Sequence, residues 1–273
     1  MTASASPTPA GRANATKPEK TLSSSFAILA RSLLFTALFY INITVRMIAA
    51  LPTIFLPYSF LHGVLRRYAS SSLWLLRVVC GITVEWRGRE KLPDGAYLVA
   101  CKHQSSWETF ALFMLLPDPT YVLKRELMSL PLFGWLATKA RMIPVDRGSH
   151  AKAFAGMAAA AREEIARGRQ IVIFPEGTRR PPGAEPRYLP GAAFLYAELG
   201  LPCVPIALNS GLFMPRRSVR RYPGTVLVEV LDPIPAGLDR REFLTRLQSV
   251  LEEATARLVA EGRNQATDIG NQE

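Results

Sequence analysis

The sequence predicts an α/β fold in which a largely parallel sheet is flanked by helices, preceded by a hydrophobic segment of two membrane-associating helices. Three observations support this prediction. Short apolar runs alternate with amphipathic stretches from about residue 82 onward, as in strands connected by helices. Most of these runs are continuously apolar, which is typical of parallel strands covered on both faces. Upstream of them, Arg46 is the only charged residue between Ser32 and Leu65.

These patterns divide the chain into four parts. We expect residues 1–24 to be a disordered tail, because they are rich in Ala, Ser, Thr and Pro and have no apolar period that could offset the entropy of ordering. Residues 25–68 should form the hydrophobic helices and residues 69–262 the α/β domain. A frayed polar tail over residues 263–273 should follow.

The hydrophobic segment is short for a membrane span. Spanning a bilayer takes about 20 apolar residues, and residues 32–45 fall short of that, while residues 47–65 include Pro52, Pro57 and His62. The segment is therefore one distorted span, or two short helices that enter one leaflet, and we favour the second. A helical hairpin packed on the protein is the third alternative. Arg66 and Arg67 follow directly, where cations meet lipid phosphates or mark a cytoplasmic flank.

The elements of the α/β domain follow in order. Residues 82–86 alternate like an edge strand, and residues 96–101 are apolar throughout, like a buried strand. The helix over residues 149–167 has Ser149 as a cap and Gly168 just past its end, and the helix over residues 190–199 is bounded in the same way by Pro190 and Gly200. We also expect strands over 120–123, 142–145, 170–174, 202–207 and 226–230, and helices over 106–116, 130–138 and 239–261.

Composition indicates an anionic partner. The 273 residues include 33 Lys and Arg against 22 Asp and Glu, for a net charge of +11, and 49% are hydrophobic. A basic chain binds nucleic acid or an anionic lipid surface. Because the sequence has no RNA-binding signature, we predict a phospholipid membrane and no nucleic acid. Its three histidines have no metal-ligand spacing, so no metal is expected. Three separate cysteines fit a reducing compartment.

The first candidate site is His103 with Glu108. A buried strand ends at the histidine, and the carboxylate follows five residues later near a helix start. A histidine whose ring is oriented by a carboxylate can take a proton from a hydroxyl. Two alternatives stay open: His103 can be a core histidine, and Ser105-Ser-Trp-Glu108 also matches a capping box. A covalent route through Cys101, Ser105 or Ser106 is a further alternative, although no Gly-x-Ser-x-Gly motif occurs.

The second candidate site is Glu176-Gly177-Thr178-Arg179, which follows another buried strand, with Arg147 at the end of a third. Arginine binds phosphate through two parallel N–H groups. Gly177 allows close approach of the backbone, and Thr178 offers a hydroxyl. We interpret this set as an anion clamp. The alternative is that Arg147 forms an ion pair with Asp146 or Glu176.

Four segments in this order resemble the four sequence blocks of the glycerolipid acyltransferases, specifically the bacterial 1-acyl-sn-glycerol-3-phosphate acyltransferases. The segments are His103-Gln-Ser-Ser-Trp-Glu108, Ala140-Arg-Met-Ile-Pro-Val-Asp-Arg147, Phe174-Pro-Glu-Gly-Thr-Arg179 and Val204-Pro-Ile-Ala207. The resemblance covers roughly residues 70–235, so residues 69–262 would be the acyltransferase domain. Two positions differ from the family pattern: Glu108 stands where Asp is usual, and Leu189 stands where a basic residue usually precedes the proline.

The resemblance implies transfer of a fatty acyl group from acyl-CoA or acyl carrier protein to the 2-hydroxyl of lysophosphatidic acid, giving phosphatidic acid without a cofactor. His103 would be the base and Glu108 its orienting acid. Arg147 and Arg179 would bind the phosphate, with Glu176, Gly177 and Thr178 lining the acceptor site.

In this reading Lys102 or Lys124 is a candidate for stabilising the oxyanion or contacting the donor. The protein would lie at the cell membrane with its catalytic domain on the cytoplasmic face. Two alternatives remain: an acyltransferase for glycerol-3-phosphate or another lysolipid, and a catalytically silent lipid-binding protein.

Overall fold

The computed structural model describes residues 19–146 and 150–272, with side chains over 25–146 and 154–264. Its centre is a seven-stranded sheet in the order β1-β7-β6-β2-β5-β3-β4. Neighbouring strands are parallel except for the β6–β7 pair, and β1 lies at an edge, as the sequence predicts. The strands are β1 (Ile82–Arg87), β2 (Leu98–Cys101), β3 (Pro119–Lys124), β4 (Ile143–Val145), β5 (Gln170–Ile173), β6 (Cys203–Leu208) and β7 (Gly224–Val230).

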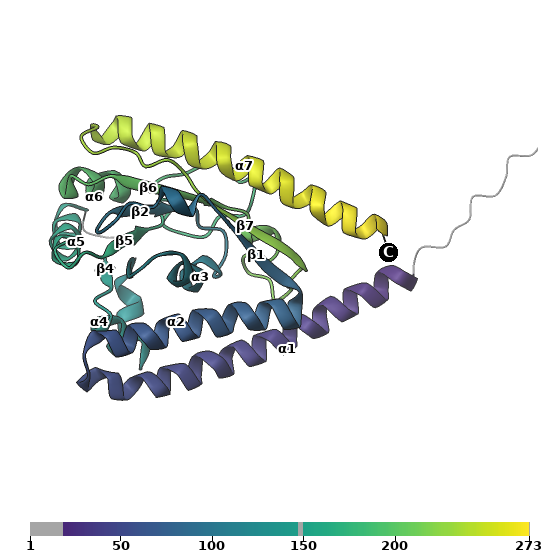
Figure 1. The fold of residues 1–273 in the computed structure, drawn as a ribbon. Coiled ribbons are helices and arrows are strands. Elements are labelled where there is room, and N and C mark those ends of the chain that lie inside the picture. The colour runs from purple at the N-terminus through teal and green to yellow at the C-terminus, as the bar shows by residue number, and fades with distance from the viewer. Residues whose placement is uncertain (1–18, 147–149, 273) are drawn as a thin grey trace, which may run out of the picture.

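Helices cover both faces of this sheet (Figure 1). The long helix α7 lies across one face, beside α5 and α6, and the pair α1–α2 lies across the other, with α3 between this pair and the sheet. The helices are α1 (Glu19–Ala50), α2 (Tyr58–Leu75), α3 (Glu108–Leu115), α4 (Phe133–Lys139), α5 (His150–Ile165), α6 (Gly191–Leu199) and α7 (Arg240–Gln272).

The side chains of β2 show how the two faces are filled. Val99 and Cys101 are buried in the cluster that includes α3 and the α1–α2 pair. Leu98 and Ala100 are buried in the second cluster, with α5, α6 and α7. Because successive residues of a strand point to opposite faces, a strand buried on both sides must be apolar at every position. This accounts for the continuous apolar runs on which the prediction of a parallel sheet rested.

The hydrophobic segment forms two helices, but the first is longer than expected. Helix α1 runs without interruption from Glu19 to Ala50, so it begins inside the range for which we expected no regular structure. Pro52 and Pro57 lie at the turn to α2, where the missing N–H of proline costs no helical hydrogen bond. The helix over residues 25–55 is long and apolar enough to cross a bilayer, and only 11% of its most apolar window is buried.

The α1–α2 pair also packs on the α/β domain, as the hairpin alternative predicts. Phe39 of α1 lies 5.8 Å from Phe110 of α3, measured between ring centroids. At the turn end, Tyr58 of α2 donates a hydrogen bond of 2.7 Å to Asp118 and accepts one of 2.7 Å from the buried Arg169. Arg169 is in turn paired with Glu164 at 2.7 Å. A buried cation paired with residues of several elements links these elements to one another.

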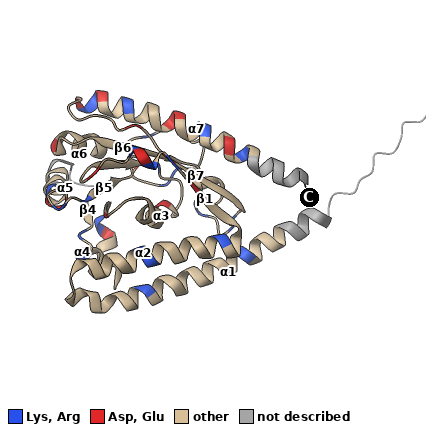
Figure 2. Ribbon diagram, in the orientation of Figure 1, with Lys and Arg blue, Asp and Glu red and all other residues tan. Residues whose placement is uncertain are grey.

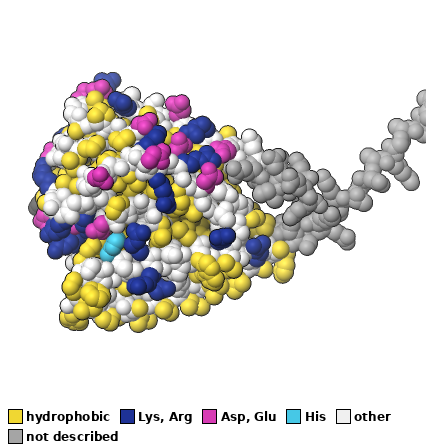
Figure 3. Space-filling view, in the orientation of Figure 1, with side chains coloured by type: hydrophobic (Ala, Val, Ile, Leu, Met, Phe, Trp, Pro, Cys, Tyr) yellow, Lys and Arg dark blue, Asp and Glu magenta, His cyan; other side chains and the backbone are white. Residues whose placement is uncertain are grey.

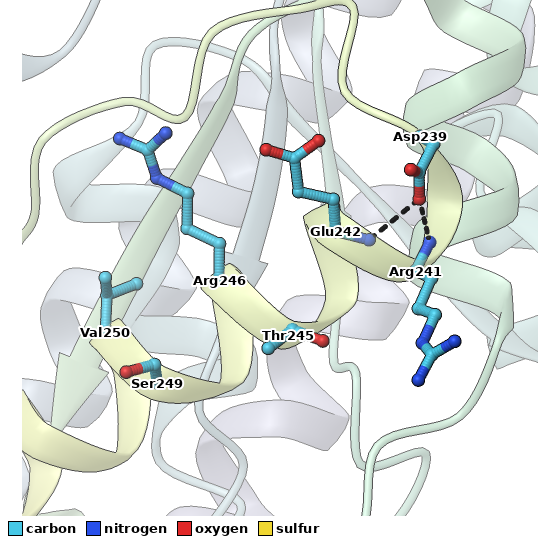
Figure 4. Close-up of a pocket in the computed structure, with 7 residues that line it drawn as sticks. All are labelled: Asp239, Arg241, Glu242, Thr245, Arg246, Ser249 and Val250. Carbon is cyan, nitrogen blue, oxygen red and sulfur yellow. Dashed lines mark hydrogen bonds between the residues drawn. The ribbon is translucent and has the colours of Figure 1, made fainter.

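Charge is distributed unevenly over the two helical layers. Helix α7 carries both acidic and basic residues along its coloured part, whereas the coloured parts of α1 and α2 carry a few basic residues and no acidic ones (Figure 2). Asp239 caps α7 by accepting hydrogen bonds of 2.8 Å from the backbone N–H groups of Arg241 and Glu242 (Figure 4). The helix continues to Gln272. It is therefore longer than the helix expected over 239–261, because the polar composition that suggested a tail over 263–273 is also compatible with a helix.

Candidate active site

His103 lies two residues after the end of β2, at the carboxyl edge of the sheet, where ligands of α/β proteins bind. Its backbone N–H donates to Glu176 Oε2 at 2.8 Å, and its ring stacks on Phe174 with 4.1 Å between centroids. The His103 side chain is 15% exposed. It is thus neither free in solvent nor sealed in the core, and it can meet a substrate.

Glu108 is completely buried at the start of α3, and its carboxylate accepts five hydrogen bonds. Oε1 accepts from His103 Nδ1 at 2.9 Å and from the backbone N–H groups of Gln104 and Ser105 at 2.6 and 2.8 Å. Oε2 accepts from the hydroxyls of Ser105 and Ser210 at 2.9 and 3.0 Å. The contact with His103 and the contact with the Ser105 N–H therefore coexist, but the second is not a capping box, because α3 begins at Glu108 with Trp107 as its N-cap.

These contacts determine the protonation of the pair. Burial by itself raises the pKa of the Glu108 carboxyl, but hydrogen bonding and charge from His103, together with the backbone N–H of Ser105, outweigh burial and hold the pKa below its usual value. An ionised carboxylate only accepts hydrogen bonds, so His103 Nδ1 must carry a hydrogen. The lone pair of Nε2 is then left to accept a proton.

Glu176 holds the turn after β5 to the turn after β2. Its carboxylate is buried and accepts from the His103 backbone N–H through Oε2 and from Lys102 Nζ through Oε1 at 2.7 Å. Burial raises its pKa, and the ammonium of Lys102 opposes that effect. Both oxygens are thus engaged within the protein, which assigns Glu176 to positioning His103 more readily than to contacting an acceptor.

Lys102 points away from His103. Its ammonium also pairs with Glu252 of α7, on the opposite face of the sheet from the His103 ring. Lys124 ends β3 with a side chain that is 43% exposed, and its ammonium lies 3.7 Å from Glu126. The geometry therefore disfavours Lys102 as an oxyanion contact, and among the described residues Lys124 has no hydrogen bond or ion pair with His103 or Glu108.

The turn that contains Arg179 lies directly against the His103 turn, because the backbone N–H of Arg180 donates to the His103 carbonyl at 2.8 Å. Gly177 has a φ of 62°, which favours glycine, and Thr178 is exposed. Arg179 is half-buried, and among the described residues its guanidinium has no hydrogen bond or ion pair. Arg147 lies outside the described residues, and Asp146 pairs with Arg125 at 2.6 Å.

The three candidate nucleophiles beside His103 are unfavourably placed. Cys101 is fully buried, and burial raises the pKa of its thiol well above the usual value. Ser105 directs its hydroxyl to Glu108 and accepts the Trp107 N–H at 2.9 Å. Ser106 is exposed. The geometry thus favours direct attack by a substrate hydroxyl over a covalent enzyme intermediate.

Sequence reasoning missed Ser210 and Phe174 as parts of this site. Ser210 follows β6, and small polar residues directly after a buried strand are a signal that could have identified it. Phe174 was predicted to be the end of a strand and the first residue of the Phe174-Pro-Glu-Gly-Thr-Arg179 segment, but it was not predicted to contact His103. The surface hollow of Figure 4 is elsewhere: it lies along α7 and is lined by Asp239, Arg241, Glu242, Thr245, Arg246, Ser249 and Val250.

Similarity to known proteins agrees with this geometry. A family model described as Acyltransferase matches residues 83–209. The chain is 38% identical over 167 residues to the 1-acyl-sn-glycerol-3-phosphate acyltransferase of Pseudomonas aeruginosa, which covers 61% of this chain and 65% of that relative. It is 30% identical over 200 residues to the lyso-ornithine lipid O-acyltransferase of the same organism, which covers 66% of this chain and 76% of that relative.

A solved structure has the same fold. The crystal structure of the 1-acyl-sn-glycerophosphate (LPA) acyltransferase PlsC from Thermotoga maritima matches with a TM-score of 0.68 and 20% identity, over 84% of this chain and 97% of the other. The family model falls on the strands and turns that carry His103, Glu108 and Arg179. On the family match and on the extent of the second relative, the chain belongs to the acyltransferase family.

Proposed function

We propose that this chain transfers a fatty acyl group from acyl-CoA or acyl carrier protein to the 2-hydroxyl of 1-acyl-sn-glycerol-3-phosphate, giving phosphatidic acid. The observation that carries the proposal is the His103–Glu108 pair at the carboxyl edge of the sheet, with Arg179 on the adjoining turn. The named activity of the first relative supports the choice of substrate. The acyl thioester is the second substrate, and the proposed reaction needs no cofactor.

In the proposed mechanism, His103 Nε2 accepts the proton of the acceptor hydroxyl while that oxygen attacks the thioester carbonyl. Glu108 stabilises the imidazolium through the Nδ1 hydrogen bond of 2.9 Å. When the tetrahedral intermediate collapses, the carbon–sulfur bond breaks, and the proton moves from Nε2 to the departing thiolate. The products are the ester and the free thiol, and the imidazole returns to its starting form.

Arg179 would bind the phosphate of the acceptor. The turn that carries Arg179 lies against the His103 turn, and its guanidinium has no hydrogen bond or ion pair among the described residues, whereas a guanidinium with a structural role is normally paired. Arg147, which follows β4 in the sequence and lies outside the described residues, is proposed as the second phosphate ligand. Gly177 and Thr178 would line the same site, and Lys124 remains a proposed contact for the donor.

We place the protein at the cell membrane with its catalytic domain on the cytoplasmic face. Helix α1 offers an exposed apolar surface to lipid, and the three buried free cysteines fit a reducing compartment. Both substrates suit this location, because the acceptor resides in the bilayer and the donor is made in the cytoplasm.

The proposal is tested by thiol release from acyl-CoA with lysophosphatidic acid in mixed micelles, together with mass analysis of the product. His103→Ala should lower turnover by about 10²–10⁴-fold, the usual contribution of a general base. Ser106→Ala, which changes an exposed side chain in the same turn, should retain the parental rate. Near-parental turnover by a folded His103→Ala protein would exclude the mechanism.

The same assay separates the competing functions. Faster turnover with lyso-ornithine lipid than with lysophosphatidic acid would favour the activity named for the second relative, whose acceptor would leave Arg179 without a phosphate. Faster turnover with glycerol-3-phosphate would indicate an earlier acylation step. Binding of phosphatidic acid without thiol release would indicate a silent lipid-binding protein.

A further inference from the structure

A hydroxyl from the turn after β6 reaches the carboxylate of Glu108 from the side opposite His103. Ser210 is completely buried, and its Oγ lies 3.0 Å from Glu108 Oε2 and 3.1 Å from Ser105 Oγ. Ser105 Oγ already accepts the Trp107 N–H and is placed to donate its single hydrogen to Glu108 Oε2. Ser210 is thus left to donate its own hydrogen to Oε2.

The turn that carries Ser210 is held on three sides. Asn209 donates to the Leu258 carbonyl of α7 at 3.0 Å and accepts the Leu227 N–H of β7 at 2.8 Å. The Gly211 N–H donates to Gln104 Oε1 at 2.9 Å. A Cβ at Gly211 would lie 2.7 Å from Pro182 Cδ and 3.0 Å from Gln104 Cβ, so the turn is pressed against the His103 turn. The hydroxyl of Ser210 is therefore presented from a rigid support.

In this arrangement the two carboxylate oxygens of Glu108 have different hydrogen-bond partners. Oε1 faces His103 and the backbone N–H groups, and Oε2 faces the two hydroxyls. The terminal torsion of a glutamate side chain is soft, with broad minima, so contacts on Oε2 determine whether Oε1 stays aligned with Nδ1. A catalytic pair loses rate when its geometry shifts by a fraction of an ångström.

We propose that Ser210 is a positioning residue for the catalytic base: its hydroxyl fixes Glu108 Oε2 and thereby holds Oε1 against His103 Nδ1. This inference rests on the proposed function, in which His103 takes the proton of the acceptor hydroxyl. It assigns a task to a residue outside the region matched by the family model, which ends at residue 209.

Removing the hydroxyl should have two effects. The carboxylate should lose part of its alignment, which lowers kcat. It should also keep more negative charge on the oxygen that faces Nδ1, which favours the imidazolium and moves the acidic limb of the pH dependence of kcat/KM to higher pH. A side chain with only a packing role would not move that limb.

Other ionisable groups near the pair should not produce the shift. Burial raises the pKa of the Cys101 thiol and of the Tyr121 phenol well above their usual values, so both stay neutral at the pH of the assay. Glu176 and Lys102 are paired with each other, and neither contacts Ser210. Their effects on the acidic limb of the pH dependence should therefore be the same in the parent and in a Ser210 variant.

The length of Glu108 offers a second test. Shortening the side chain to aspartate withdraws the carboxylate by about 1.5 Å, one carbon–carbon bond. If the shorter aspartate carboxylate keeps its hydrogen bond with His103, it can no longer reach the hydroxyl of Ser210. Ser210→Ala should therefore cost much less in a Glu108→Asp background than in the parent, as in a double-mutant cycle of coupled residues.

The experiment measures kcat and KM for the full chain in mixed micelles from pH 5.5 to 9, with acyl-CoA and lysophosphatidic acid, for the parent, Ser210→Ala, Glu108→Asp and the double variant. We expect Ser210→Ala to lower kcat about tenfold, the loss of one charge-assisted hydrogen bond, with KM little changed. The acidic limb should rise by roughly half a pH unit. The loss in the Glu108→Asp background should be twofold or less.

Three results would overturn the inference: parental kcat in folded Ser210→Ala, a lowered kcat with an unmoved acidic limb, or equal losses in the two backgrounds. His103→Ala in the same series separates this inference from the function on which it rests. If His103→Ala is inactive and Ser210→Ala behaves like the parent, only the role of Ser210 is wrong. If His103→Ala is active, the proposed function is wrong.

Discussion

His103 is held through its ring and through its backbone by different partners. Glu108 and Phe174 contact the ring, and Glu176 contacts the backbone N–H. The two carboxylates belong to different elements, since Glu108 begins α3 and Glu176 follows β5. Loss of the Glu108 contact should therefore disturb the orientation of the ring without releasing the strand end from its place.

Arg179 should act on acceptor binding. Arg179→Ala removes the guanidinium that we expect to bind phosphate, so KM for lysophosphatidic acid should rise roughly 10- to 100-fold, the value of a lost charge-assisted contact. Turnover of a monoacylglycerol, which has no phosphate, should change little. The control is Arg180→Ala, because that guanidinium donates to the Glu185 carbonyl at 2.8 Å. A similar loss with both acceptors would argue against a phosphate ligand.

Glu108 should make stability depend on pH. Its pKa in the folded protein lies below the usual value of 4.5, so its contribution to stability is complete above pH 4.5 and is lost as the pH falls towards the lowered value. Glu108→Gln should cost about 2 kcal/mol at pH 7, or roughly 4–8 °C in Tm. We expect this difference to narrow below pH 4.5.

Thermal unfolding in detergent at pH 7 and at pH 4 measures this difference. The control is Glu253→Gln, which changes an exposed carboxylate of α7 and should follow the parent at both pH values. A Glu108→Gln deficit of the same size at pH 4 as at pH 7 would show that packing, and not ionisation, is responsible.

The strands and the helices that cover them could be predicted from the sequence because each has a local signal. Continuous apolar runs mark the central strands, and a Gly at the end of a helix can adopt the left-handed conformation, as Gly200 does with a φ of 62°. Helix α1 was predicted less well, because prolines reveal where a helix cannot continue but not how far the preceding helix extends. Its 32 residues include polar positions that the apolar run did not contain.

The candidate site was predictable where it is local in sequence. His103 and Glu108 are five residues apart, and a strand followed by a helix start brings such residues together. Ser210 is 102 residues from Glu108, and only the order of the strands places β6 beside β2. The side-chain orientation of Lys102 could not be predicted either, because its ammonium pairs with Glu252 of α7, 150 residues away, on the face of the sheet opposite the His103 ring. Contacts of this kind depend on topology, for which a single sequence has no short-range signal.

Acidic side chains are unevenly distributed over the face shown in Figure 3. They lie over the part of the surface away from α1 and α2, whereas the part formed by α1 and α2 shows apolar side chains with some basic ones. No acidic residue occurs between Glu19 and Glu85, and the charged residues in that stretch are all basic. This distribution fits contact with an anionic bilayer, in which apolar groups enter the lipid and cations meet its phosphates.

Membrane binding should therefore depend on the exposed stripe of α1. Leu34, Ile41, Val45 and Ile48 repeat at helical spacing and are each more than half exposed. Replacing Ile41 and Val45 together by Asp should lower co-sedimentation with anionic vesicles by at least tenfold, because buried charge is strongly unfavourable in lipid. The matched control places Asp at Thr245 and Ser249, an exposed pair with the same spacing on α7. Equal binding by both double variants would place the membrane contact elsewhere.

The helical pair is joined to the rest of the protein near both of its ends. At one end Tyr58 is bonded to Asp118 and Arg169, and at the other Arg31 donates to the Val79 carbonyl at 2.6 Å while Ser32 accepts the Arg221 N–H at 2.8 Å. Because the α1–α2 pair is attached at two distant points, it cannot rotate relative to the α/β domain. At the proposed membrane location, the imidazole of His103 would lie at a fixed height above the lipid surface, so the proposed lysolipid acceptor would have to leave the bilayer partly to reach it. Lysolipid in a loosely packed leaflet, from which a single-chain lipid emerges easily, should therefore be acylated faster than lysolipid in a tightly packed one.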